Sequence, residues 1–357
     1  MSKALFFVLY IIYYITLCST NALSCKSDSG LDTSFWIALK EPSGTGYIYY
    51  DDSTPFSFSS HSMNDTTEGA LAQTLSQIWS NDGVNTVQYI MYNDENPSVP
   101  DTDDTNGYNF TVGHTKAVWA FDTDGGFILQ HSIPGFPLGP MYSDTYTGLP
   151  GSAWTYGQSI ACMNFELPAI TSIAGLATLM IPNIYDSRVT ESAPSSIQRL
   201  VAGDILRMPV CNQTAISLLG NRDSGHDSGG TDNIIFFAKS AEWNNELWAE
   251  CVAPFFESDL VVESWIHGEA VGPSCTGKYQ TLDITELSYP TIGSFSEYYD
   301  HSKWAIASEG EENGLVCFGD INRMTSQFLR GGGAFCFFDT TLWQSLHQSV
   351  LDTNNCV

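Results

Sequence analysis

The most constraining feature of this sequence is a local pattern that occurs twice. A His-x-Lys tripeptide is followed by an apolar, strand-like segment, an acidic turn that contains glycine, and a second strand-like segment. The chain has seven histidines and seven lysines in 357 residues. Random placement of these residues would produce only about 0.1 His-x-Lys matches, so two matches in the same context indicate an internal duplication. The first copy occupies residues 114–130 and the second residues 301–319.

The two tripeptides predict a phosphate-binding site. Side chains at positions i and i+2 of an extended segment share a face, so His114 points with Lys116 and His301 with Lys303. Two such edges facing each other would surround one phosphate with two imidazoles and two ammonium groups. Phosphoryl transfer needs a nucleophile, a proton donor for the leaving oxygen and cations for the remaining oxygens. We therefore predict these four residues as catalytic, with no metal or other cofactor. The alternative, ordinary surface residues at strand ends, explains one match better than two.

In the first hairpin, the strand register predicts another residue of the site. Phe121 and Phe127 flank the turn, and we expect them to pair. That register places His131 opposite Ala117 and makes His131 a candidate for binding the substrate. The remaining histidines occur in loop-like or helical contexts and are predicted to be structural or exposed; they are His61, His226, His267 and His347.

The second hairpin predicts two more candidates in the same way. Pairing of Ser308 with Gly314 sets Gly319 opposite Lys303 and brings the segment after Gly319 close to the second tripeptide. Asn322 is then a candidate for orienting the substrate, and Arg323 a candidate phosphate clamp. The alternatives are a turn asparagine and a solvated arginine.

The distribution of apolar residues predicts an α+β, or mixed α/β, fold. Short segments rich in aromatic and β-branched residues, bounded by Gly, Asp, Asn or Pro, predict strands. The clearest are 35–39, 47–50, 87–91, 118–121 and 127–129. Helical spacing of apolar residues occurs at 71–79, at 243–251 and at 342–350, the last behind Asp339 as an N-cap.

The duplication divides the mature chain into two predicted halves, 23–187 and 188–357. Residues 188–196 would connect them. Two polar stretches are predicted to be exposed loops: the acidic segment 93–107, just before the first tripeptide, and the glycine-rich segment 221–233.

The N-terminus predicts entry into the secretory pathway. Residues 1–22 resemble a signal peptide, with an apolar run at 4–17 that is shorter than the roughly 20 residues of a membrane span. No later stretch qualifies as a span. Eight cysteines follow, an even number without metal-site spacing, which favours disulfides over zinc. Glycosylation sequons at Asn64, Asn109 and Asn212 agree with a secreted or lysosomal destination.

The charge of the chain opposes ordinary nucleic-acid binding. The formal net charge is −27, from 13 basic and 40 acidic residues, and such a surface should repel a polyphosphate at neutral pH. Near pH 4 to 5 many carboxylates are protonated, all seven histidines are expected to be largely charged, and the chain approaches its pI of about 4.2. A nuclease hypothesis therefore requires an acidic working compartment.

Together these motifs resemble the deoxyribonuclease II family, a variant of the phospholipase D fold. The similarity covers essentially the whole mature chain. The stretches that carry it are GHTKAVWAFD (113–122), LQHSIPGFP (129–137), YGQSIAC (156–162), DHSKWAIA (300–307), VCFGDINR (316–323) and RGGGAFC (330–336).

The resemblance implies a phospholipase D-like pseudo-dimer in which two duplicated halves share one active site. It implies DNA as substrate, cut at acid pH without a divalent metal to 3′-phosphate and 5′-hydroxyl ends. His301, in the D-H-S-K stretch, would be the principal catalytic residue and His114 its partner, one attacking phosphorus and the other protonating the leaving oxygen. The implied disulfides are Cys25–Cys162, Cys275–Cys356 and Cys317–Cys336, with Cys211 and Cys251 paired or free.

The sequence departs from the full phospholipase D motif, H-x-K-x4-D. Phe121 and Ser308 stand where that motif has Asp, which argues against lipid hydrolysis. Two alternatives stay open: a secreted, non-catalytic protein that binds nucleic acid or host partners on this scaffold, and a phosphodiesterase that acts on lipid or nucleotide. The sequence also leaves open whether the chain is a monomer or a homodimer.

Overall fold

The computed structural model describes residues 23–80, 87–97, 112–219, 233–309 and 314–356. It is a sheet-rich α+β fold with few helices, as predicted. The described helices include none that is both long and apolar enough to cross a membrane. Several predicted features lie outside the described residues: the signal peptide, most of the loop 93–107, the sequon at Asn109, and nearly all of the loop 221–233 with His226.

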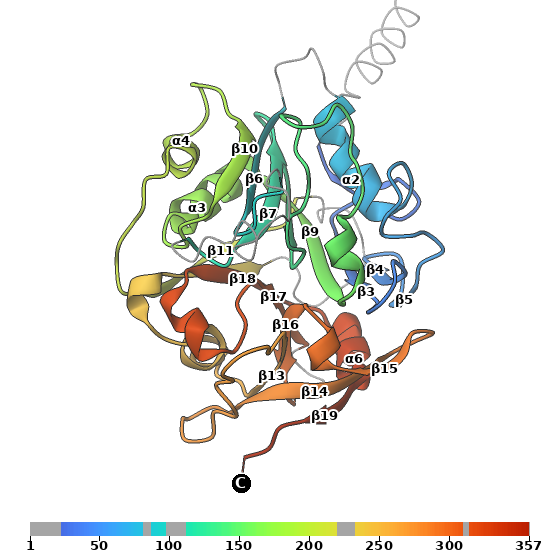
Figure 1. The fold of residues 1–357 in the computed structure, drawn as a ribbon. Helices are drawn as coiled ribbons and strands as arrows, with labels where there is room; N and C mark the ends of the chain where they lie inside the picture. Colours follow the sequence, from blue (N-terminus) through green and yellow to red (C-terminus); the bar gives the residue numbers. More distant parts are fainter. Residues whose placement is uncertain (1–22, 81–86, 98–111, 220–232, 310–313, 357) are drawn as a thin grey trace, which may run out of the picture.

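The first sheet has eight strands, all from the N-terminal part of the chain (Figure 1). In spatial order they are β10 (Ile184–Arg188), β6 (Gln88–Asn93), β7 (Lys116–Phe121), β8 (Gly125–His131), β9 (Gln158–Glu166), β3 (Phe35–Lys40), β4 (Tyr47–Asp51) and β5 (Ser57–Phe58). A separate small sheet pairs β1 (Cys25–Lys26) with β2 (Asp32–Thr33).

The second sheet has nine strands from the C-terminal part of the chain. In spatial order they are β11 (Cys211–Ile216), β12 (Ile234–Lys239), β18 (Gly332–Phe338), β17 (Leu315–Gly319), β16 (Lys303–Ala307), β13 (Leu260–Ser264), β14 (Thr281–Tyr289) and β15 (Gly293–Ser296), with β19 (Val350–Thr353) beside β14.

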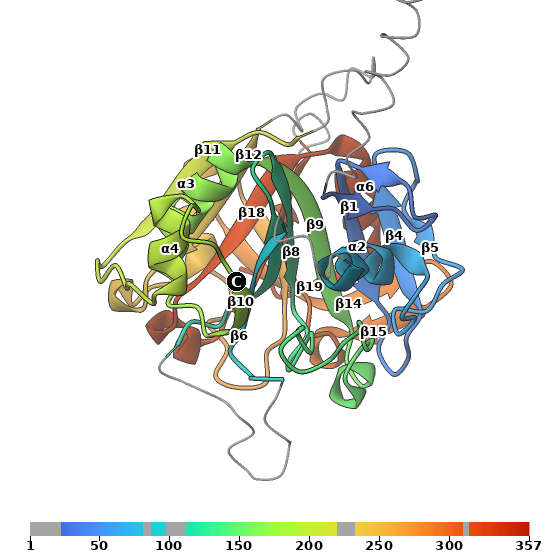
Figure 2. The ribbon, with the colours of Figure 1, turned by 90° about the horizontal axis from the view of Figure 1, so that it is seen from above.

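The helices are α2 (Gly69–Ser80), α3 (Leu167–Ala177), α4 (Ser195–Val201), α5 (Ala253–Phe256) and α6 (Thr340–Ser349). Short 3₁₀ turns are η1 (Gly151–Trp154), η2 (Ala241–Trp243), η4 (Glu297–Tyr299) and η5 (Thr325–Leu329), and η3 (Trp248–Val252) is a π-helix. Seen from above, α2 lies on the side of the first sheet away from α3 and α4 (Figure 2).

Both faces of the sheets are buried, in separate cores. Ile37 of β3 and Ile306 of β16 belong to one core that contains residues of both sheets, together with α3 and α6. Their neighbours Trp36 and Ala305 point the opposite way into two further cores, because successive side chains of a strand alternate between faces. The first of these outer cores contains α2, and the second contains η3 and the start of α5.

Two of the three predicted helices form as expected. The apolar residues Leu71, Leu75 and Ile78 of α2 pack into the outer core of the first sheet. In α6, the predicted N-cap is confirmed, since the Asp339 carboxylate accepts a hydrogen bond from the Leu342 backbone N–H at 2.9 Å. This bond satisfies one of the donors that a helix N-terminus leaves unpaired.

The predicted helix at 243–251 is wrong as a single element. Only the end of η2 and, after a break, η3 lie in this range, and α5 follows directly after it. Asn244 has φ 51°, a left-handed conformation that ends η2. The apolar spacing correctly indicates which residues are buried, since Leu247 and Trp248 are fully buried. The spacing does not reveal that the helix is interrupted after Trp243.

The register of the first hairpin also differs from the prediction, by one residue. Phe121 pairs with Gly126, and Ala117 therefore pairs with Gln130 rather than with His131. The turn is tighter than expected because the Asp122 carboxylate accepts hydrogen bonds from the backbone N–H groups of Asp124 and Gly125, at 2.8 and 3.2 Å. The second hairpin has the predicted register, with Trp304 opposite Phe318.

Four disulfides join the described cysteines. Three are the pairs that the family resemblance implies, and the fourth joins Cys211 to Cys251, which the sequence left open. Cys25–Cys162 ties the N-terminus to β9, and Cys317–Cys336 links neighbouring strands of the second sheet. Cys275–Cys356 attaches the C-terminus near β14.

Of the two buried disulfides, we expect the one that closes the longer loop to stabilise the fold more. Cys25–Cys162 spans 137 residues and Cys317–Cys336 spans 19. The loss of loop-closure entropy in the unfolded state gives about 5 kcal/mol for the first and about 3 kcal/mol for the second. Urea unfolding of the two double Cys→Ala variants measures both losses. Equal losses, or a larger loss for the shorter loop, would contradict this expectation.

Candidate active site

Both His-x-Lys tripeptides lie where a strand begins. Lys116 is the first residue of β7 and Lys303 the first residue of β16, so each histidine stands just before its strand. The two strands belong to different sheets, which touch where β8 meets β17 and β9 meets β16. His114 is 2% exposed and His301 3% exposed. The tripeptides therefore lie inside the junction of the sheets and are not exposed strand ends.

Each histidine ring is held by a carbonyl of the opposite sheet's segment. His114 Nδ1 contacts the carbonyl oxygen of Asp320, which follows β17. His301 Nδ1 lies 2.8 Å from the carbonyl oxygen of Ser132, which follows β8. A carbonyl can only accept, so Nδ1 carries the hydrogen in each ring. Nε2 is then the atom left for chemistry, as a nucleophile when neutral and as an acid when protonated.

The backbone of each histidine is bonded across the junction as well. His114 N–H donates to the carbonyl of Gly331 at 2.8 Å, and His301 N–H donates to the carbonyl of Gly157 at 2.9 Å. Both glycines are required by close approach. A Cβ would lie 2.2 Å from the Met180 carbonyl oxygen at Gly331 and 2.4 Å from the Asp300 carboxylate at Gly157.

The first lysine belongs to a buried network of charges. Lys116 donates to the Asp94 carboxylate, and Arg330 Nη1 lies 3.1 Å from the second oxygen of the same carboxylate. That oxygen is also 3.9 Å from His114 Nε2. Burial alone would raise the pKa of Asp94, but the charges of Lys116 and Arg330 outweigh it and lower that pKa. Asp94 is therefore an anion that compensates two buried cations.

The second lysine lies against its own histidine. Lys303 Nζ is 3.0 Å from His301 Nδ1 and donates to the His301 carbonyl oxygen at 2.5 Å. Burial lowers the pKa of Lys303 well below its usual range, and the charge of Lys116 lowers it further. The influence of Lys116 on Lys303 indicates that the two tripeptides share one electrostatic environment.

Both histidines are disposed to be neutral in the free protein. Burial lowers the pKa of His114 well below its usual range, and the charges of Lys116 and Arg330 add to the effect. Burial likewise lowers the pKa of His301, followed by the charges of Lys303, Lys116 and His114. A bound phosphate would oppose these shifts, because its negative charge favours protonation of a nearby imidazole.

Asp320 contributes less negative charge to the site than its residue type suggests. Burial raises the pKa of its carboxyl to about 7. Its Oδ1 accepts a hydrogen bond from the Gly333 N–H at 2.7 Å. At acid pH this side chain is largely neutral and does not repel a phosphate.

The candidates His131 and Asn322 both lie buried beside this region. His131 ends β8, next to Ser132; its Nδ1 accepts from the Ile133 N–H at 3.2 Å, and its Nε2 is buried without a partner among the described residues. Burial, followed by the charge of Lys116, lowers the pKa of His131 to about 3. Asn322 Oδ1 is also buried without a described partner. Neither atom is used in a hydrogen bond among the described residues.

Arg323 is held in a different set of contacts. Its guanidinium donates to Asp283 at 2.5 Å, to the Gly272 carbonyl at 3.0 Å and to Ser274 at 3.1 Å. These bonds attach β14 and the loop before it to the segment after β17. We therefore leave Arg323 out of the substrate-binding residues proposed below.

Sequence reasoning missed Asp94 and Arg330. The acidic segment 93–107 was predicted to be an exposed loop, but Asn93 ends β6 and both Asn93 and Asp94 are fully buried. Asp94 can be buried because Lys116 and Arg330 compensate the charge of its carboxylate. Its only sequence signal is position: Asp94 directly follows the strand that pairs with β7.

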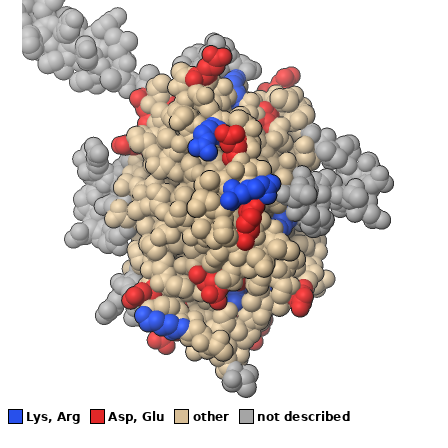
Figure 3. All heavy atoms as spheres, turned by 90° about the vertical axis from the view of Figure 1, so that its left-hand side faces the viewer, with Lys and Arg blue, Asp and Glu red and all other residues tan. Residues whose placement is uncertain are grey.

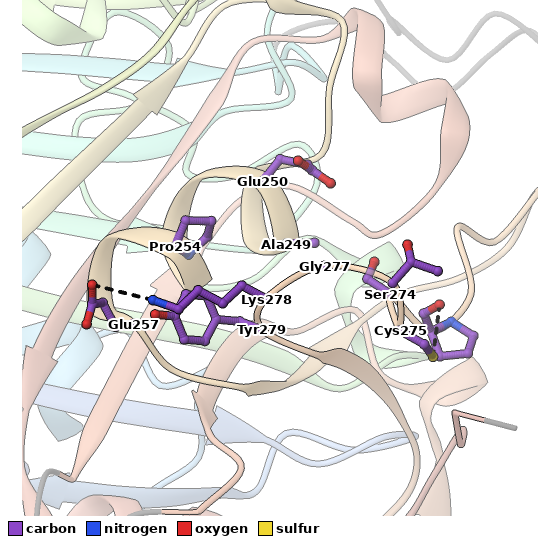
Figure 4. Close-up of a pocket in the computed structure, with 11 residues that line it drawn as sticks. Ala249, Glu250, Pro254, Glu257, Ser274, Cys275, Gly277, Lys278 and Tyr279 are labelled. Carbon is purple, nitrogen blue, oxygen red and sulfur yellow. Dashed lines mark hydrogen bonds and ion pairs between the residues drawn. The ribbon is translucent and has the colours of Figure 1, made fainter.

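Other parts of the surface suit a phosphate less well. A hollow of about 580 Å³ lies between η3–α5 and the loop before β14. Figure 4 shows Glu250 and Glu257 at this hollow, with Lys278 directed toward Glu257 at 3.9 Å. On the face drawn in Figure 3, described basic side chains are scattered among acidic ones and form no continuous strip.

Comparison with known proteins gives a consistent result. The family model of deoxyribonuclease II matches residues 24–356. Cell-death-related nuclease 7 of Caenorhabditis elegans is 30% identical, over 99% of this chain and 93% of its own length. Deoxyribonuclease-2 of the same organism is 30% identical, over 94% of each chain. Deoxyribonuclease-2-alpha of Mus musculus is 28% identical, again over 94% of each.

The charge network predicts that Asp94 is essential to stability. Asp94→Asn would leave the buried cations Lys116 and Arg330 without their anion, and we expect a loss of about 3–5 kcal/mol in the free energy of unfolding. Urea denaturation at pH 7 measures the loss. Asp204→Asn is the matched control, because Asp204 pairs with Arg199 at the surface, with side chains 57% and 60% exposed, and such pairs contribute little. Similar losses in both variants would contradict the network.

Proposed function

Because this chain belongs to the deoxyribonuclease II family, we propose that it is an endonuclease that hydrolyses the phosphodiester bonds of DNA. The observation that carries the proposal is the convergence of both His-x-Lys tripeptides on the junction of the two sheets. The names of the similar proteins support DNA as the substrate. Intact His114, Lys116, His301 and Lys303 argue against a non-catalytic binding protein.

The proposed mechanism divides hydrolysis between the two histidines. Nε2 of one neutral imidazole attacks phosphorus, and the bond from phosphorus to the 5′-oxygen breaks. The other histidine, protonated at Nε2, gives its proton to that oxygen. Now neutral, it removes a proton from water, which attacks the phosphohistidine and releases a 3′-phosphate. The Nδ1–H bonds to Ser132 and Asp320 support this division, because they fix both tautomers.

Cationic side chains would supply the charge stabilisation that this mechanism needs. In this proposal Lys116 and Lys303 would neutralise the non-bridging oxygens of the phosphate, and Arg330 would keep the local charge positive beside Asp94, which it shares with Lys116. His131 and Asn322 would bind the substrate through their buried atoms without described partners. The proposal is therefore metal-independent: these cations take the role that a divalent ion has in other phosphoryl transfers.

We also propose that the fold is a phospholipase D-like pseudo-dimer of halves 23–187 and 188–357. Its support is a repeated arrangement: β6-β7-β8-β9-β3 and β13-β16-β17-β18-β12 are adjacent in the same order, with antiparallel pairing throughout. Each half supplies one tripeptide, and each supplies the carbonyls that hold the other's histidine. Such reciprocity is what a duplicated unit with one shared site would have.

The signal peptide and the four disulfides support a secretory route that ends in lysosomes or outside the cell. Of the proposed glycosylation sites, Asn212 is exposed on β11, whereas Asn64 is half-buried and accepts a hydrogen bond from Leu149 at 3.0 Å. Asn212 is the better acceptor of a glycan because it is the more exposed of the two.

The shared site predicts that neither histidine can act alone. His301→Ala and His114→Ala should each lower plasmid cleavage at pH 5 by at least roughly 10²–10⁴-fold while the proteins stay folded. Lys116→Ala and Lys303→Ala should lower it roughly 10²–10³-fold. The control is His347→Ala, since His347 stacks on Trp343 of α6 at 4.8 Å and should be dispensable.

Rapid denaturation in alkali should identify the nucleophile, because the nitrogen–phosphorus bond of a phosphohistidine is stable in base and labile in acid. Peptide mass spectrometry should find the 3′-phosphoryl end of the cleaved strand on one histidine, and the variant of the other should accumulate it, because breakdown then lacks its base. Near-normal cleavage by either folded histidine variant would show that the site is not shared.

The lowered pKa values predict an acid optimum. A histidine whose pKa is lowered stays neutral as pH falls past its usual value near 6.5, so the protonated proton donor becomes populated only in more acidic solution. We expect kcat/KM to rise as pH falls below about 6.5, with a maximum between about pH 4.5 and 5.5, in excess chelator. A profile that rises toward pH 8, or activity that requires magnesium or calcium, would contradict the mechanism.

A further inference from the structure

A line of aromatic rings leads from His301 to the surface, and the proposed mechanism does not use it. The Trp265 ring centroid lies 4.5 Å from that of His301. His267 stacks on Trp265 at 4.0 Å, and Tyr298 stacks on His267 at 4.0 Å. Tyr299 packs edge-on against Tyr298 at 5.4 Å. We call Trp265, His267, Tyr298 and Tyr299 the aromatic ladder.

The ladder is fixed by elements that also position the catalytic histidine. Trp265 directly follows β13, and the two tyrosines of η4 directly precede Asp300 and His301. His267 Nε2 is 2.9 Å from the Tyr298 carbonyl. Tyr156 packs edge-on against Trp265 at 5.5 Å and His267 at 5.7 Å. These contacts hold the rings in place before any ligand binds.

Two observations point to a ligand. Tyr298 is 49% exposed and Tyr299 50% exposed, although both are large aromatic residues. Trp265 Nε1 is buried and has no hydrogen-bond partner among the described residues. A buried N–H without an acceptor is costly unless something supplies one. The ladder therefore has exposed tyrosine rings at its outer end. At its inner end, next to His301, it has the Trp265 N–H group, which donates to no described residue.

A hollow of about 380 Å³ adjoins the outer end of the ladder. Tyr299 lines it, together with residues that include Ser43, Phe295 and Ser296, and no charged side chain is among its lining residues. The volume falls within the roughly 300–1,000 Å³ of small-molecule sites. In a chain with 40 acidic residues, an uncharged hollow at the outer end of the ladder is suited to a nucleoside.

We propose that the aromatic ladder is a base-stacking subsite for the nucleotide next to the scissile phosphate, on the His301 side. The base stacks on Tyr299, which Tyr298 supports edge-on, and enters the adjoining hollow, and Trp265 Nε1–H donates to an oxygen of the same nucleotide. This inference rests on the proposed nuclease function. Stacking accepts any base, because every base has a flat face, so the subsite favours an unpaired nucleotide without selecting its sequence.

An abasic scan tests the subsite without altering the protein. A single-stranded oligonucleotide with one preferred cut is prepared with an abasic residue at each position in turn. Base stacking on aromatic side chains corresponds to about 5- to 100-fold in affinity per base. We expect kcat/KM of the wild-type protein at pH 5 to fall by this factor at one position beside the cut, through KM rather than kcat.

Variants locate the effect on the ladder. Tyr298→Leu and Tyr299→Leu should raise KM for the intact oligonucleotide and remove the penalty for the abasic residue, whereas Tyr298→Phe, which keeps the ring, should retain both wild-type values. Phe255→Leu is the matched control, since Phe255 is 42% exposed on α5, outside the ladder. If a leucine variant fails to fold, the abasic scan and the Phe variant still decide.

The outcomes separate this inference from the nuclease proposal. Wild-type protein that cleaves but is indifferent to every abasic position overturns the subsite alone, as does an unchanged penalty in both leucine variants. Absence of cleavage by the wild-type protein overturns the nuclease function instead. In that case, fluorescence anisotropy measures the binding of the same oligonucleotides to the His114→Ala protein. The stacking proposal then requires that one abasic strand binds more weakly than the intact strand.

Discussion

The site depends on reciprocal hydrogen bonds across the junction of the two sheets. The segment after β17 holds the His114 ring and the segment after β8 holds the His301 ring, through one carbonyl each. Without the opposite sheet, either imidazole would lose both its orientation and its fixed tautomer. The carbonyls of Gly331 and Gly157 accept from the backbone N–H groups of the same two histidines, and the lack of a side chain leaves room for the Met180 backbone at Gly331 and for the Asp300 carboxylate at Gly157. The site is therefore complete only where the two halves pack together.

Electrostatics at the junction reconciles an acidic chain with an anionic substrate. Asp94, the anion paired with the buried cations, is committed to Lys116 and Arg330, and Asp320 has a pKa raised to about 7 by burial. As pH falls, neutral carboxyls and newly protonated imidazoles shift the local charge toward positive. The chain's net charge of −27 then matters less than the potential where the phosphate would lie. The same burial that lowers the histidine pKa values favours activity in acid.

The two ends of the site are alike in their histidines and lysines but differ in what flanks them. Asp94 follows β6 beside the first tripeptide, and Trp265 follows β13 beside the second, at equivalent positions in the strand pairing. At one position the Asp94 carboxylate binds two cations. At the other, the Trp265 indole is the first ring of the aromatic ladder. If the aromatic ladder binds a base as proposed, this difference gives a substrate strand a direction across an otherwise symmetric pair of motifs.

The sequence by itself determined the strand and turn content, the N-cap of α6, the even set of cysteines and the paired tripeptides, because periodicity, capping and short motifs are local properties. It determined the register of the second hairpin but not of the first, where the Asp122 carboxylate tightens the turn. The tertiary structure decided that Asp94, Arg330 and Trp265 join the tripeptides and that Arg323 is tied to Asp283. Strand pairing within one sheet brings Asp94 to Lys116 and Trp265 to the second tripeptide. Only the packing of one sheet against the other brings Arg330 to Asp94, because these two residues come from different halves of the chain.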